Sequence, residues 1–160
     1  MSRLFAVSGA LFGLCAVLLG AFGAHGLEDH VSVERLEVWA TAAHYLGWHA
    51  TTLLALAALT QLLPASRLLA GAGLALIVGS LIFSGSLFLL VLTDTGAWGA
   101  VTPIGGVALA IGWGLGVVAL WRGVGQPRQD QRPVRVKEME IPQQQKGRDH
   151  RHFRWERHRR

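Results

Sequence analysis

Four apolar stretches separated by short polar segments make up the chain as far as residue 121. They cover about residues 4–22, 39–63, 68–93 and 101–121, and none contains Lys, Arg, Asp or Glu between its ends. A helix needs about 20 apolar residues to cross ~30 Å of hydrocarbon, and a soluble helix of this length would carry a polar stripe. The pattern therefore predicts an all-α fold, an integral membrane four-helix bundle.

The polar segments between these stretches predict where the helices end. Residues 23–38 contain the turn Gly23-Ala24-His25-Gly26 and several acidic side chains, while residues 64–66 and 94–96 are short turns. We expect residues 28–37 to form a short amphipathic helix on the membrane surface. We also expect the fourth helix to begin with Thr102 as its N-cap and Pro103 at its first helical position.

Charge divides the chain into two domains. Residues 1–122 form the predicted transmembrane domain, and residues 123–160 form a predicted disordered basic tail that is too poor in apolar residues to fold alone. The chain has 15 basic residues, and 12 of them follow Trp121. Such a tail beside a membrane is expected to bind anionic lipid headgroups, and nucleic acid need not be invoked as a partner.

The distribution of basic residues also predicts an orientation. Four spans place Arg3, Arg67 and the tail on one side of the membrane, with Arg35 alone on the other among acidic neighbours. Because loops rich in Lys and Arg stay in the cytoplasm, both termini are expected there. Residues 1–23 also resemble a cleaved signal peptide. Its removal would leave three spans, so we favour the uncleaved form.

Small residues within the spans predict close helix packing, since association in lipid depends on backbones approaching each other. The predicted packing positions are Gly9, Gly13, Gly79, Ser84, Gly85, Gly112 and Gly116. Lining a permeation path is the alternative for these positions. Tryptophans near span ends predict interfacial anchors at Trp39, Trp98 and Trp121, whereas Trp48 and Trp113 are expected to pack deeper.

Three histidines are the candidate binding residues, because an ionisable group at membrane depth is often functional. His25 ends the first span, and His44 and His49 lie within the second. They could ligate haem, bind a quinone or relay protons, or each could be neutral and hydrogen-bonded to a neighbouring helix. His44 and His49 are five residues apart, about 140° around a helix, so they cannot share a ligand face, and no metal site is predicted.

The sequence contains no pattern typical of an enzyme. Ser84-Gly85-Ser86 has no nearby base, and no phosphate-binding loop or pair of catalytic carboxylates is present. Cys15 lies within an apolar run and is expected to be a small hydrophobic residue. We therefore expect a non-enzymatic protein with no cofactor.

Several motifs in order resemble one known family over about residues 3–122. They are Gly20–Leu27, Trp39 with Thr41-Ala42, Tyr45 and His49-Ala50, then Phe83–Leu87 with Leu89-Leu90, Thr102–Gly106 and Gly112-Trp113. The chain resembles the YgdD-like small inner-membrane proteins, a domain of unknown function 423 related to a small eukaryotic transmembrane protein. The resemblance implies four helices in the bacterial inner membrane and no established activity, cofactor or catalytic residue. The chain departs from the family at Phe88, where Tyr is frequent, and in its long tail.

The sequence thus leads to a functional hypothesis and an alternative. The hypothesis is a multi-pass membrane protein of unknown biochemical activity that acts through protein partners or lipids. The alternative is a haem- or quinone-associated redox subunit that uses the histidines within the membrane. A solute permease is less favoured, because the spans lack acidic residues that could pair with a cation.

Overall fold

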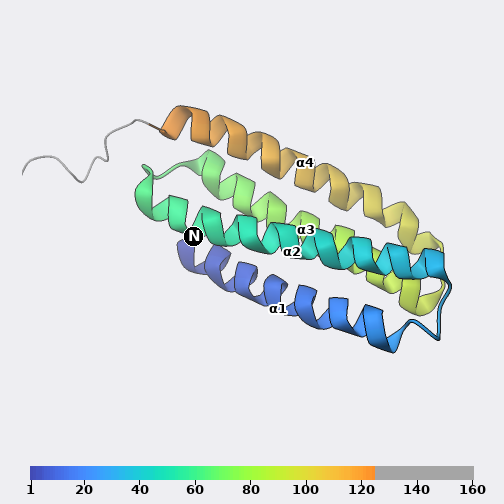
Figure 1. Cartoon of the computed structure of the whole chain (residues 1–160). Coiled ribbons are helices and arrows are strands. Elements are labelled where there is room, and N and C mark those ends of the chain that lie inside the picture. Colours follow the sequence, from blue (N-terminus) through green and yellow to red (C-terminus); the bar gives the residue numbers. More distant parts are fainter. Residues whose placement is uncertain (125–160) are drawn as a thin grey trace, which may run out of the picture. The chain divides into compact units, whose positions relative to one another are not determined.

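Four long helices make up the computed structural model, which describes residues 1–124. They are α1 (Ser2–Gly26), α2 (Val33–Leu62), α3 (Arg67–Thr93) and α4 (Ala97–Gly123). Consecutive helices run antiparallel, so the N-terminus, the α2–α3 turn and the end of α4 lie at one end of the bundle (Figure 1). The described residues contain no strand, which confirms the all-α prediction. Beyond Val124, the predicted tail lies outside the described residues.

Side chains with local hydrogen-bonding capacity set the helix boundaries. Ser32 and Ser66 cap α2 and α3, each accepting a hydrogen bond at 3.4 Å from a backbone N–H three residues later. α3 ends at Asp94, which adopts a left-handed conformation with φ 50°. Aspartate tolerates this region better than most residues, because its short polar side chain can hydrogen-bond locally.

Two predicted boundaries are wrong. The surface helix expected at residues 28–37 does not form separately, because α2 starts at Val33 and continues without interruption. Helix α4 begins at Ala97, with Gly96 as its N-cap and Pro103 inside the helix. Pro103 has no N–H to donate, and membrane helices tolerate such a loss where nearby side chains satisfy the freed groups.

The four helices pack as two hairpins that meet along α2 and α3. α1 packs on α2, α4 packs on α3, and the α2–α3 contact joins the hairpins. Residues from all four helices form the main core, in which Phe5, Leu53 and Leu76 are fully buried. α1 also touches α3, where Phe5 lies against Gly73.

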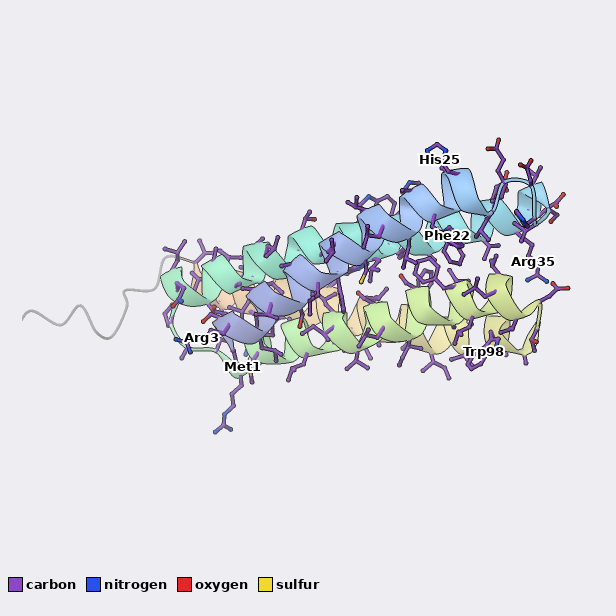
Figure 2. The ribbon with its side chains drawn as sticks, turned by 90° about the horizontal axis from the view of Figure 1, so that it is seen from below. Met1, Arg3, Phe22, His25, Arg35 and Trp98 are labelled. Atoms are coloured by element: carbon purple, nitrogen blue, oxygen red, sulfur yellow. The ribbon has the colours of Figure 1, made fainter. Side chains whose placement is uncertain are left out.

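The outer surface of the bundle carries many large apolar side chains. More than half of each of Leu11, Val17, Val107 and Val117 is exposed, whereas large contiguous apolar surfaces are rare on soluble monomers. Within residues 1–124, α1, α3 and α4 are long and apolar enough to cross a membrane. α2 does not meet that measure of hydropathy. It nevertheless lies alongside the other three over the length of the bundle (Figure 2), so a bilayer crossed by its neighbours is crossed by α2 as well.

Candidate functional site

His49 is the centre of the polar structure inside the bundle. Its ring is 5% exposed, and its Nδ1 lies 2.7 Å from the carbonyl oxygen of Tyr45 one turn earlier. A carbonyl only accepts, so Nδ1 carries the hydrogen and Nε2 is free to accept. Trp113 of α4 donates its indole N–H to His49 Nε2 at 3.2 Å. Both ring nitrogens of His49 are therefore used within the protein, and the bond at Nε2 connects α2 to α4.

The other two candidate histidines lie elsewhere. His25 is exposed at the end of α1 and points away from the bundle (Figure 2). His44 is exposed on α2, and its ring lies nearly parallel to that of Trp48, with centroids 6.3 Å apart. The structure therefore does not bring His25, His44 and His49 together. Among the described residues, no group of three His, Cys, Asp or Glu side chains could hold a metal ion.

Between the start of α2 and His49, aromatic residues hold α2 against α1 and α3. Trp39 is 2% exposed, so the prediction that it anchors at the membrane interface is wrong. Its indole N–H donates to the carbonyl of Leu19 at 2.7 Å, and its ring packs against Phe88 of α3. A Cβ at Gly23 would meet the indole at 2.7 Å, so the glycine makes room for Trp39.

The predicted packing residues fall into two groups. At Gly9, Gly79 and Gly112, a Cβ would come within 2.8–3.1 Å of the backbone of a neighbouring helix. These contacts lie between α1 and α2 for Gly9 and between α3 and α4 for the other two.

The remaining predicted positions are less tightly packed. A Cβ at Gly13 would make only ordinary contact at 3.8 Å, and at Gly85 and Gly116 it would meet no described atom within 4 Å beyond their own stretch of helix. Gly85 and Gly116 therefore do not serve close packing within this chain. Ser84 is 1% exposed, and its hydroxyl has no hydrogen-bond partner among the described residues.

Two of the three exposed tryptophans among the described residues border separate grooves. Trp48 is 61% exposed and Trp113 is 52% exposed, whereas the sequence predicted deeper packing for both. Trp48 lies beside a groove of about 610 Å³ between α1 and α2. Trp113 lies beside a groove of about 490 Å³ between α2 and α4, with Leu76 of α3 also lining it.

Polar contacts of Arg35 with Leu90 and Asp94, here called the clasp, join the two hairpins at the end of the bundle opposite the N-terminus. Arg35 near the start of α2 forms an ion pair with Asp94 at the end of α3, and its Nη1 donates to the carbonyl of Leu90 at 3.1 Å. Both the clasp and the His49–Trp113 bond join residues more than 50 positions apart. A single sequence contains no signal for such pairings, so sequence reasoning missed them.

Comparison with known proteins identifies the family. The family described as "Protein of unknown function (DUF423)" matches residues 19–106. The UPF0382 membrane protein YwdK of Bacillus subtilis (strain 168) is 43% identical over 117 residues, covering 73% of this chain and 95% of that protein. The UPF0382 membrane protein SAB0533 of Staphylococcus aureus (strain bovine RF122 / ET3-1) is 40% identical over 123 residues, covering 77% of this chain and 99% of that protein. No solved structure matches the chain. The chain belongs to the DUF423 family of UPF0382 membrane proteins, whose function is unknown.

Proposed function

We propose that this protein is a non-enzymatic, multi-pass protein of the bacterial inner membrane that acts by binding an anionic phospholipid. The observation that carries the proposal is the groove between α2 and α4. It extends from Thr51 to Leu59 on α2 and from Gly112 to Leu120 on α4, about 12 Å along each helix. That length is close to the ~15 Å thickness of one hydrocarbon leaflet.

The lining of this groove suits a hydrocarbon chain. Its polar groups already have partners, because the hydroxyls of Thr51 and Thr52 both donate to the carbonyl of Trp48 and the indole N–H of Trp113 donates to His49. The remaining lining side chains are aliphatic. A polar ligand would lose its hydration there without gaining hydrogen bonds, whereas a lipid acyl chain has none to satisfy.

Charge favours an anionic headgroup for that lipid. The groove leads toward the end of the bundle where Arg3, Arg67 and Arg122 are exposed, and no acidic residue among residues 1–124 lies at that end. A basic residue next to an anionic membrane surface contributes ~1 kcal/mol of attraction. The basic tail, which lies outside the described residues, would add to this attraction if it follows the same rule.

Filling the groove tests the proposal directly. Gly116 borders the groove, and a side chain there would meet no described atom within 4 Å. Gly116→Leu should therefore fill the groove without disturbing the fold. Gly114 is a matched control, since it is equally open on the same helix but does not line the groove.

The measurement is lipid retained after purification in mild detergent, read by native mass spectrometry with phosphatidylglycerol as the added probe. Wild type and Gly114→Leu should retain one phosphatidylglycerol molecule in preference to a zwitterionic lipid, and Gly116→Leu should lose it. Equal retention by both variants, or no preference for the anionic lipid, would overturn the proposal.

The orientation forms part of the proposal. Arg3, Arg67 and Arg122 share one end of the bundle, whereas Arg35 lies at the acidic end, and the positive-inside rule places the first group in the cytoplasm. Reporter fusions after Arg3, after Arg67 and at the C-terminus should all report a cytoplasmic position. A periplasmic signal at the C-terminus would contradict four spans.

The haem form of the redox alternative receives less support from the geometry. Ligation by His49 would require breaking at least one of its two hydrogen bonds, and His25 and His44 lie apart from it on the outer surface. Purified protein with a Soret absorption band that disappears in His49→Ala would favour haem binding and count against the lipid proposal.

A further inference from the structure

The groove between α1 and α2 differs in chemistry from the acyl-chain groove. Small residues of both helices form its walls, among them Ala16, Gly20, Ala40 and Gly47, and its volume is about 610 Å³. A Cβ at Gly20 would meet no described atom within 4 Å. The small side chains therefore leave a trough on the outer surface that no part of the described chain fills.

Two ring systems along this groove have unused hydrogen-bonding nitrogens. His44 and Trp48 both line it and are both exposed. Neither the imidazole nitrogens of His44 nor the indole N–H of Trp48 have a hydrogen-bond partner among residues 1–124. By contrast, the indole N–H of Trp39 and of Trp113 and both nitrogens of His49 are paired. The unpaired groups thus coincide with the unfilled trough.

The position of His44 along α2 places it among lipid acyl chains and below the headgroups. His44 is seven residues beyond Glu37, the last charged residue near the start of α2, about 10 Å along the helix axis. Half of the hydrocarbon thickness is ~15 Å, so His44 lies within the acyl-chain region of one leaflet. A polar group there without a partner is costly. The partner must be a molecule that dissolves in hydrocarbon and still offers hydrogen-bonding oxygen atoms.

We infer that the α1–α2 groove binds a lipid-soluble quinone, with its ring against His44 and Trp48 and its apolar tail along the trough. The rings of His44 and Trp48 are within 16° of parallel, which offers a flat ligand an aromatic surface. The indole N–H can donate to a quinone carbonyl. A neutral imidazole has one donor and one acceptor, so His44 can bind either the carbonyl of a quinone or the hydroxyl of a quinol.

This site is independent of the proposed phospholipid groove, and the two can fail separately. The test uses full-length protein in nanodiscs of one zwitterionic lipid, titrated with the short-chain quinone decylubiquinone. Saturable quenching of tryptophan fluorescence reports binding. Gly20→Leu fills the trough without an internal clash, and Gly114→Leu is the matched control because it is equally open on another helix.

The expected results separate binding from partitioning into the bilayer. Wild type, Gly114→Leu and Gly116→Leu should show the same saturable quenching, and Gly20→Leu should lose it. His44→Leu should raise the dissociation constant about tenfold, which corresponds to one hydrogen bond worth about 1.4 kcal/mol. His25→Leu, a histidine outside the groove, should leave it unchanged.

Two outcomes would overturn the inference. Quenching that is linear in quinone and identical in Gly20→Leu would mean that the quinone only partitions into the lipid. A wild-type dimer that Gly20→Leu converts to a monomer, with quinone quenching unaffected, would assign the trough to a second copy of the chain. Far-UV circular dichroism of each variant checks that the four helices are intact.

Discussion

The approach of α3 to α4 at Gly105 allows a sharp test of how this bundle is held together. A Cβ at Gly105 would lie 2.7 Å from the Cα and 2.9 Å from the Cβ of Phe83, and closer still to its backbone nitrogen. A backbone atom cannot turn aside as a flexible side chain can, so Gly105→Ala must push the two helices apart. At the adjacent Gly106, a Cβ would meet only the ring of Phe83, at 3.9 Å.

The two alanine variants differ in this contact and little else. In a helix, replacing Gly by Ala adds about 1 kcal/mol of intrinsic stability, and this gain applies to both positions. Overpacking an interface costs about 1–3 kcal/mol, and only Gly105→Ala incurs it. We therefore expect Gly106→Ala to be neutral or stabilising by up to about 1 kcal/mol, with Gly105→Ala less stable than Gly106→Ala by about 1–3 kcal/mol.

The assay is reversible unfolding in mixed micelles, followed by circular dichroism and tryptophan fluorescence. The comparison between the two variants removes the effect of helix propensity, because both substitutions are the same and both positions lie in α4. Equal free energies of unfolding for the two variants, or a more stable Gly105→Ala, would refute the reasoning that helix approach in this bundle is limited by the backbone of Phe83.

Three further predictions follow from buried and terminal polar groups. Ser84→Ala should be neutral or stabilising in the same unfolding assay because its hydroxyl is buried without a partner, whereas Ser86→Ala should cost about 1 kcal/mol because that hydroxyl is paired. Arg35→Gln should lower the free energy of unfolding by about 1 kcal/mol, with a loss that shrinks at high salt as the ion pair is screened. A hydrogen bond from Ser32 lowers the pKa of Glu34, so the stabilisation from this contact is present above the ordinary glutamate pKa and is lost as pH falls through the lowered one. Ser32→Ala should raise that pKa, measured by NMR titration in micelles, and an unchanged titration would contradict the assignment.

The helices could be predicted from the sequence more accurately than their contacts. Uncharged runs of this length have one stable form in lipid, so the number of helices and the turns at residues 64–66 and 94–96 followed from composition. The start of α4 did not, because Pro103 signals a first turn in water and is tolerated inside a membrane helix.

The candidate site was predictable only in part. His44 and His49 stand out in any reading of the sequence, since histidine is rare at membrane depth, but nothing local distinguishes the paired one from the unpaired one. In a soluble helix the apolar stripe indicates the buried face. Here α1, α3 and α4 are apolar all round, so the sequence does not show which faces meet, and only small residues give a hint. That hint holds for Gly9 and fails for Gly116, which faces open space.

The polar groups of α2 differ in whether the protein provides them with a partner. This helix contacts both α1 and α3, so protein covers it on two sides. Polar groups on its inner faces can be satisfied by the protein, as Trp39 and His49 are through Leu19 and Trp113. By the same logic, a polar group of α2 that faces the membrane without a protein partner needs another explanation. His44 is that group, and this contrast within one helix is the reason for locating ligand binding in the α1–α2 groove.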